Sequence, residues 1–238
     1  MLFIIVCTEV DIMLDKRITI FCGHYGSGKT NLAVNYAFYL KNKGQTVVVS
    51  DLDIINPFFR TKDSEEEFRK AGIELISSEY ANSSLDIPTI PAEMQRVFED
   101  RSFSAVLDVG GDERGSVALG RFAPMIKEEN DYNMVFVVNF YRPLTRTAEE
   151  ALSMLRMIEG VTGLKFTSII NNSCLGVHTT EEDVLSTLSL ADELSRLSGV
   201  PVAYTSAQKT LCEKLQGKVE NLFPLTLQEK YFRVTGIR

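Results

Sequence analysis

The sequence predicts an α/β fold: a doubly wound, mostly parallel sheet with helices on both faces. Three observations carry this prediction. Short apolar runs rich in β-branched residues alternate with longer stretches of helical periodicity. One run, Met134 to Val138, is apolar at every position, as in strands that are buried on both faces of a parallel sheet. A glycine-rich segment joins the first predicted strand to the first predicted helix.

The predicted strands are short apolar runs bounded by polar or turn-forming residues. They cover residues 18–22, 46–50, 73–76, 104–109, 134–138, 166–170 and 202–205.

The predicted helices fill the intervals between these strands, and several of their ends carry recognisable signals. Gly44 closes the first helix, and Pro91 opens the third. Thr147 with Glu150 fits a capping box, as does the pair Thr179 and Glu182. The predicted helices cover residues 31–43, 64–71, 91–100, 147–158 and 179 to about 199. Pattern alone assigns no structure to residues 217–238.

Length and composition favour one globular domain. The chain has 238 residues, of which 45% are hydrophobic and 24% charged, and no repeat or long linker divides it. We assign residues 13–238 to this domain. Residues 1–12 form an apolar run that is too short to cross a bilayer and has no preceding Lys or Arg. They are either an extra edge strand or the result of a start codon assigned too early, with Met13 as the true start.

Charge and cysteine content narrow the cellular location and the classes of binding partner that we expect for this protein. The net charge of −7 disfavours a nucleic-acid binder, and the chain ends lack a basic amphipathic helix of the membrane-targeting kind. The four cysteines form no C-x-x-C pair, which disfavours zinc-ribbon, iron–sulfur and thioredoxin-like sites. Scattered cysteines are typical of a reducing compartment, so we expect a cytoplasmic protein.

The glycine-rich segment Gly23–Thr30 matches the phosphate-loop pattern G-x-x-x-x-G-K-[ST] completely, in the required strand–loop–helix context. Backbone N–H groups of such a loop point at phosphate oxygens, and the helix N-terminus adds partial positive charge. Lys29 is expected to reach the β- and γ-phosphates, and the Thr30 hydroxyl to bind Mg²⁺. The residues expected to contact the nucleotide here are Gly23, His24, Tyr25, Gly26, Ser27, Gly28, Lys29, Thr30 and Asn31.

Two predicted strands end in aspartates, at the edge of the sheet where ligands bind in such folds. One gives Asp51 and Asp53, and the other gives Asp108, with Gly111 three residues later. An aspartate in this place can hold the water shell of Mg²⁺, and the Gly111 N–H could contact the γ-phosphate. The alternative is that these aspartates only cap the following turns. The phosphate loop favours the functional interpretation.

Three motifs together resemble the ParA/MinD-like family of P-loop ATPases, which includes cobyrinic-acid-synthase-like nucleotide-binding domains and iron–sulfur cluster carriers. They are the loop 23–30, the strand end 47–53 and the segment 106–111, in the family's order and spacing. The second half of the chain matches more loosely, through residues 169–171 and 201–204.

The resemblance implies roles for individual residues. Thr30 is expected to bind Mg²⁺ directly, while Asp51 and Asp108 hold it through water. Asp53 is expected to orient the attacking water, which makes it catalytic together with Lys29. Asn171 is expected to hydrogen-bond the adenine, and the segment after Pro201 to pack against the base. The resemblance also implies ATP and Mg²⁺ as ligands and a homodimer.

One departure from the family pattern bears on activation. The family usually carries a lysine directly after the first glycine of the loop, and this lysine reaches the phosphates of a partner subunit. This chain has His24 there, followed by Tyr25 in place of a glycine. A neutral imidazole cannot replace a permanent cation. Candidate replacements are Arg60, Arg114, Arg142 and Arg146. The alternative interpretation of each is a solvated surface arginine.

Three functions remain open from the sequence, the weakest of which is a binding module that holds nucleotide without turnover. The first is a Mg²⁺-dependent ATPase that acts as a nucleotide switch and signals an unknown protein partner. The second is a biosynthetic enzyme, either a kinase or an ATP-dependent ligase for a small carboxylated substrate. The chain has no N-K-x-D motif, so GTP is disfavoured.

Overall fold

The computed structural model describes residues 14–52, 61–77, 93–111 and 113–227. Within them the chain forms a sheet of eight strands in the order β3-β2-β4-β1-β5-β6-β7-β8, and every pair of neighbours is parallel. The strands are β1 Ile18–Cys22, β2 Val47–Leu52, β3 Glu74–Ser77, β4 Ser104–Val109, β5 Tyr132–Val138, β6 Ser168–Asn171, β7 Val202–Gln208 and β8 Leu222–Leu225. The predicted parallel sheet is confirmed.

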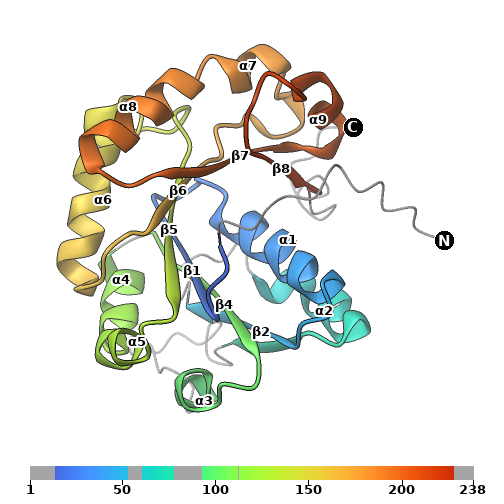
Figure 1. Ribbon diagram of the computed structural model, residues 1–238, viewed down its shortest axis with the longest axis vertical. Coiled ribbons are helices and arrows are strands. Elements are labelled where there is room, and N and C mark those ends of the chain that lie inside the picture. Colours follow the sequence, from blue (N-terminus) through green and yellow to red (C-terminus); the bar gives the residue numbers. More distant parts are fainter. Residues whose placement is uncertain (1–13, 53–60, 78–92, 112, 228–238) are drawn as a thin grey trace, which may run out of the picture.

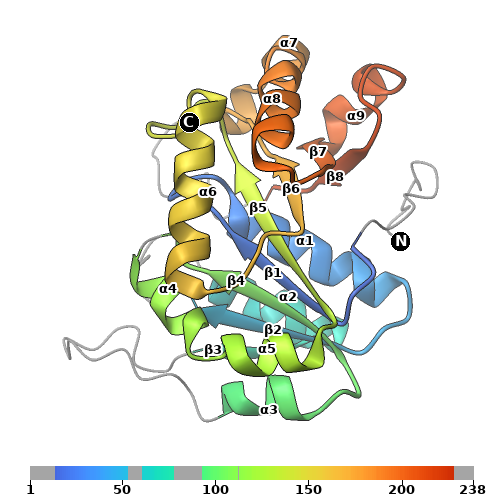
Figure 2. The same ribbon diagram turned by 60° about the vertical axis from the view of Figure 1, so that its left-hand side comes forward.

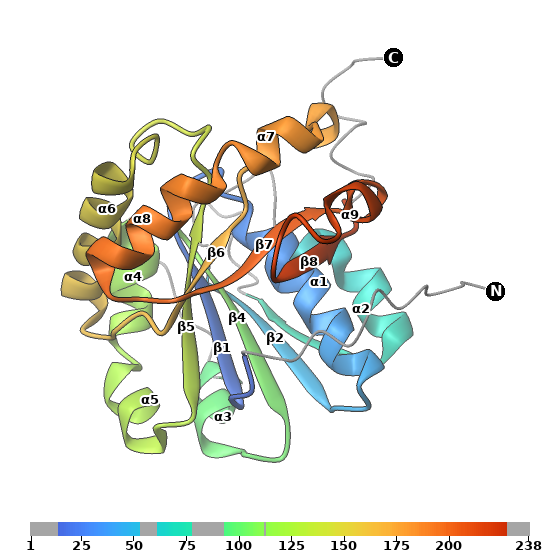
Figure 3. The same cartoon turned by 45° about the horizontal axis from the view of Figure 1, so that its top comes forward.

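Helices cover both faces of this sheet (Figure 1). Figure 2 shows α3, α4, α5 and α6 on one side, and Figure 3 shows α1 and α2 on the other. The helices are α1 Lys29–Asn42, α2 Glu65–Ala71, α3 Glu93–Glu99, α4 Glu113–Gly120, α5 Ala123–Glu129, α6 Ala148–Thr162, α7 Glu181–Leu185, α8 Leu188–Ser198 and α9 Lys209–Leu215.

The alternation of side chains along the central strands produces two separate cores. In β1, Ile18 and Ile20 pack on the α3–α6 side, whereas Phe21 packs on the α1 side. In β5, Phe136 likewise packs on the α3–α6 side and Val137 on the α1 side. Because both faces of each central strand are buried, these strands appear in the sequence as continuous apolar runs.

Several helix boundaries differ from the predictions. The second capping box is formed by Thr180 and Asp183, one residue beyond the predicted pair. The helix predicted from 179 to 199 is two helices, α7 and α8, which are separated at Ser186 and Thr187. Thr147 caps α6 as predicted, but the Glu150 carboxylate accepts from the Arg146 N–H, so that box is not reciprocal.

Among the described residues, three α-helices and one strand had no prediction: α4, α5, α9 and β8. The first of these contains Gly115 and ends at Gly120, and the other three are seven residues or shorter, so none shows a clear period. Gly115 is required by packing, because a Cβ there would lie 2.6 Å from the Gly110 carbonyl oxygen. The proposals for residues 1–12 lie outside the described residues. Leu14 is buried, and its carbonyl oxygen accepts from the Tyr36 hydroxyl at 2.7 Å.

A buried ion pair fixes the amino end of β1. Arg17 binds Glu129 at the end of α5, and both side chains are less than a tenth exposed. The guanidinium also donates to the Val97 carbonyl oxygen at 3.0 Å. One arginine therefore joins β1, α3 and α5, on the side of the sheet that α1 does not cover.

We expect Glu129→Ala to lower the free energy of unfolding by about 3 kcal/mol, because it leaves the Arg17 charge buried without its partner. Urea denaturation measures the change. The control is Asp131→Ala, which breaks the exposed pair with Lys16 and is expected to cost less than about 1 kcal/mol. Equal losses of unfolding free energy in the two variants would show that the buried Arg17–Glu129 pair stabilises the fold no more than the exposed pair does.

Candidate nucleotide-binding site

The phosphate loop, residues 23–28, connects β1 to α1 at the carboxyl end of the sheet. Gly28 caps α1 with φ +88°, a conformation that side chains rarely adopt. A Cβ at Gly28 would also lie 2.2 Å from Nδ2 of Asn172. Conformation and space therefore both require glycine at this position.

The interior of the loop fits an anion. Lys29 and Thr30 form the first turn of α1 and are buried, and Lys29 Nζ donates to the His24 carbonyl oxygen at 3.2 Å. The Ser27 hydroxyl is also buried and has no hydrogen-bond partner among the described residues. A buried ammonium, a helix N-terminus and an unsatisfied hydroxyl form a donor set that suits phosphate oxygens.

Asp51 and Asp108 are brought together as the sequence predicts. They are directly opposite each other in the parallel register of β2 and β4. By strand alternation both point to the α1 face, where Val49 and Val106 pack. Both are buried, and α1, which carries Thr30, packs against β4. Two carboxylates on the side of the phosphate-loop helix suit a hydrated Mg²⁺.

Asp108 has a further neighbour that the sequence did not indicate. Thr61 begins the 3₁₀ turn Thr61–Ser64, and its hydroxyl donates to Asp108 Oδ2 at 2.9 Å. Neither residue is exposed. Along the sequence, Thr61 lies away from the strand ends and belongs to no motif, so only the tertiary structure identifies it.

Gly111 lies directly against the phosphate loop. A Cβ at this position would be 2.1 Å from the Gly23 carbonyl oxygen and 2.8 Å from the Tyr25 nitrogen. The segment after β4 therefore reaches the loop only because residue 111 lacks a side chain. Contact of the Gly111 N–H with a γ-phosphate stays a prediction.

The residues at the tip of the loop differ in exposure and charge. Burial, and then the charge of Lys29, hold the pKa of His24 below its usual 6.5, so its imidazole is neutral at pH 7. Tyr25 is 57% exposed. Arg142, from the loop after β5, donates from Nε to the Gly26 carbonyl oxygen at 3.1 Å. Of the candidate arginines whose side chains the structure describes, Arg142 is the one with a contact to the phosphate loop.

Asn171, the last residue of β6, and Asn172, which follows it, have different contacts. Asn171 is fully buried: its oxygen accepts from the Ser173 hydroxyl at 2.6 Å, and its nitrogen donates to the Thr187 hydroxyl at 3.1 Å. Contact between Asn171 and a base stays a prediction, and it requires one of these bonds to be exchanged. Asn172 donates to the Ser27 carbonyl oxygen and accepts from the Ser206 hydroxyl, both at 2.6 Å. It therefore links the phosphate loop to β7.

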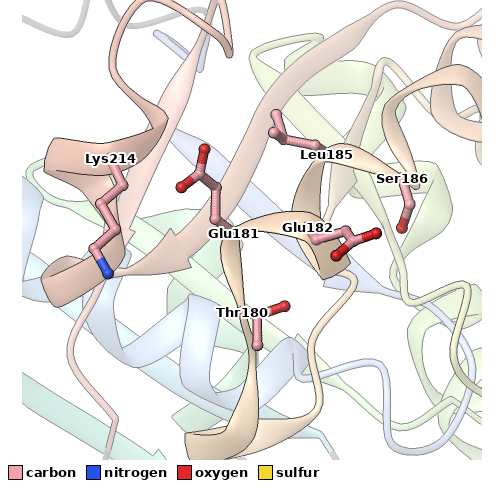
Figure 4. A pocket seen from close by; sticks show the side chains of 6 residues that line it. All are labelled: Thr180, Glu181, Glu182, Leu185, Ser186 and Lys214. Atoms are coloured by element: carbon pink, nitrogen blue, oxygen red, sulfur yellow. The ribbon is translucent and has the colours of Figure 1, made fainter.

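An open cavity of about 690 Å³ lies between α7 and α9, apart from the phosphate loop (Figure 4). Lys214 comes from α9, while the other side chains lie at α7, where Glu181 also pairs with Lys218. Its lining residues are Thr180, Glu181, Glu182, Leu185, Ser186 and Lys214.

In the part of the chain that the structure describes, no three His, Cys, Asp or Glu side chains are close enough to bind a metal by themselves. Mg²⁺ at Asp51 and Asp108 would therefore take other ligands, such as Thr30, water and phosphate oxygens.

No described helix is both long and apolar enough to cross a membrane.

Some predicted site residues lie outside the described residues. They are Asp53 and Arg60, and the side chain of Arg114 is likewise not described. The predicted catalytic role of Asp53 stays a prediction.

Comparison with known proteins gave matches at the level of structure alone. No protein-family model matched the chain, and no curated protein matched its sequence. Among solved structures, FtsY from Mycoplasma mycoides superposes with a TM-score of 0.53 at 15% identity, covering 81% of this chain and 61% of its own. Chloroplast FtsY from Physcomitrella patens gives 0.55 at 16% identity, covering 79% and 57%.

A third match is the signal recognition particle 54 kDa protein from Aeropyrum pernix, which was solved in complex with GDP. It gives a TM-score of 0.54 at 18% identity, covering 83% of this chain and 42% of its own. The chain thus spans less than two thirds of each of these proteins. At such identities the likeness concerns the fold, and this chain has the fold of the P-loop nucleoside triphosphatases.

Proposed function

We propose that this chain binds ATP with Mg²⁺ at the loop Gly23–Thr30, hydrolyses it, and acts as a nucleotide switch. The observation that carries the proposal is the convergence of Lys29 and Thr30 with the in-register pair Asp51 and Asp108 at one end of the sheet. Mg²⁺ would neutralise charge on the transferred phosphoryl group, and Lys29 would contact the β- and γ-phosphates. Asp53, which directly follows β2, is proposed to orient the attacking water.

The proposed nucleotide is ATP because the described residues that follow or end β6 and β7 offer no carboxylate to a base. Guanine differs from adenine in presenting two adjacent donors, N1–H and the N2 amino group, on its Watson–Crick edge, where adenine has one amino donor beside an acceptor nitrogen. A carboxylate is suited to accept from both guanine donors. Residues 171–180 and 205–208, which follow or end β6 and β7, contain no Asp or Glu. One of the similar solved structures, the signal recognition particle 54 kDa protein, was determined in complex with GDP. Tighter binding of GTP than of ATP would therefore contradict this assignment.

Arg142 is proposed to supply the positive charge that His24 does not. Its guanidinium is exposed and bonded to the loop backbone at Gly26. Arginine is always charged and can stabilise charge on a γ-phosphate. This places the activating cation within the same chain, while a nucleotide-dependent homodimer and a protein partner remain parts of the proposed switch.

Asn172 is proposed to hold the phosphate loop in its binding shape. Its amide bonds the Ser27 carbonyl oxygen in a buried place where water cannot replace it. A fixed carbonyl also fixes the direction of the neighbouring N–H groups that phosphate needs.

We expect Lys29→Ala to weaken ATP binding by about 10- to 100-fold, the effect of losing a hydrogen bond to a charged group. Isothermal titration calorimetry with Mg·ATP measures it. Lys41→Ala, at the other end of α1, is the control and keeps the wild-type affinity. Wild-type affinity in Lys29→Ala would remove the loop from the nucleotide site.

For Arg142→Gln we expect about a 10-fold loss of affinity for ATP and no change for ADP, because a cation beside the γ-phosphate is lost. Competition binding of the two nucleotides tests this. Arg146→Gln removes an exposed arginine from the same loop and serves as control. Equal losses for ATP and ADP would place Arg142 away from the γ-phosphate.

We expect Asn172→Ala to reduce affinity for ATP and ADP alike, by about 10-fold, because the Ser27 carbonyl loses its buried donor. The matched control is Asn35→Ala on α1, which removes hydrogen bonds to the carbonyl oxygens of Asn31 and Thr226. If Asn172→Ala bound both nucleotides as tightly as the wild type, the loop would hold its shape without this residue.

A further inference from the structure

The hydrogen bond between Thr61 and Asp108 is unexplained by the function proposed so far. It joins the first residue of the 3₁₀ turn that precedes α2 to the end of β4. Both side chains are fully buried, and the turn packs against α1 and β2, the elements that carry Thr30 and Asp51. The hydroxyl is therefore at the magnesium side of the site.

We propose that Thr61 is a positioning residue of the magnesium site, which orients the Asp108 carboxylate toward the water shell of the ion. This rests on the proposed function, because it requires a Mg²⁺-nucleotide complex at the phosphate loop. It adds a residue that neither the motifs nor the strand ends indicate.

The orientation of an aspartate carboxylate is not fixed by its own side chain. The terminal torsion of an aspartate is broad, so an unrestrained carboxylate samples many orientations. A hydroxyl that donates to Oδ2 at 2.9 Å fixes the plane of the group, and therefore also the direction in which Oδ1 points. An acceptor for Mg²⁺-bound water is useful only if its direction is fixed before the ion arrives.

Burial makes this hydroxyl hard to replace. With both residues fully buried, removal of the Thr61 hydroxyl takes away one hydrogen bond to Oδ2 that bulk water cannot replace. The orientation of the carboxylate is then less narrowly defined. Valine keeps the shape of threonine and removes only the hydroxyl, whereas serine keeps the hydroxyl.

A purely structural role is the alternative. Thr61 could serve only to attach the turn to the sheet. In that case valine and serine would change the free energy of unfolding, but they would not change how strongly Mg²⁺ promotes nucleotide binding. The ratio of ATP affinities with Mg²⁺ and with EDTA separates the two roles.

The test uses calorimetry of the full chain with ATP, once with Mg²⁺ and once with EDTA, for the wild type, Thr61→Val and Thr61→Ser. We expect Thr61→Val to reduce the gain in affinity from Mg²⁺ by about 10-fold, the size of effect typical for a group that orients a metal ligand. Affinity in EDTA should stay at the wild-type value, and Thr61→Ser should keep the gain. Thr162→Val, a buried threonine on α6, controls for the loss of a buried hydroxyl elsewhere.

The outcomes separate this proposal from the one on which it rests. No ATP binding by the wild-type chain would overturn the proposed function itself. A wild-type gain from Mg²⁺ in Thr61→Val, or an equal loss in the valine and serine variants, would overturn only the role of Thr61. If Thr61→Val does not fold, Thr61→Ala removes the same hydroxyl and gives the same comparison.

Discussion

Close backbone approach at the phosphate loop is the constraint on which the rest of the site depends. Neighbouring segments meet the loop at distances that leave no room for side chains: Val137 at Gly23, Asn172 at Gly28, and Gly111 at Gly23 to Tyr25. The three contacts come from β5, from the residue that follows β6 and from the segment after β4, so the loop shape is fixed by the parallel order of the central strands. A fold that moved any of these strands would lose the anion cradle.

The electrostatics of the site follow from which groups are buried within it. Lys29 is buried, and so is the Ser27 hydroxyl of the same loop, which has no hydrogen-bond partner among the described residues; both favour an anionic ligand. Burial and Lys29 keep His24 neutral, so this residue adds no charge to the loop. Arg142 is in place to do so, because its bond to the Gly26 carbonyl holds the guanidinium at the rim. The proposed activation therefore differs from that of the ParA/MinD-like family in one positive charge, which comes from Arg142 of the same chain and not from a lysine of a partner subunit.

Much of the fold could be predicted because buried strands and capped helices leave strong local patterns. β1 and β4 have the predicted bounds, and the phosphate loop lies where its motif places it. Helices α4 and α5 escaped prediction because they are short, and because Gly115 serves a contact with Gly110 that exists only in the folded chain. Thr61 and Asn172 escaped for the same reason: each acts across a long sequence separation, on Asp108 and on Ser27.

The most direct test of the central claim is a crystal structure of the wild-type chain with Mg²⁺ and a non-hydrolysable ATP analogue. We predict the β-phosphate within hydrogen-bond distance of the backbone N–H groups of Gly26 to Thr30, and Mg²⁺ between Thr30 and the waters held by Asp51 and Asp108. Nucleotide bound in the cavity between α7 and α9, or an empty phosphate loop at saturating analogue, would contradict the account.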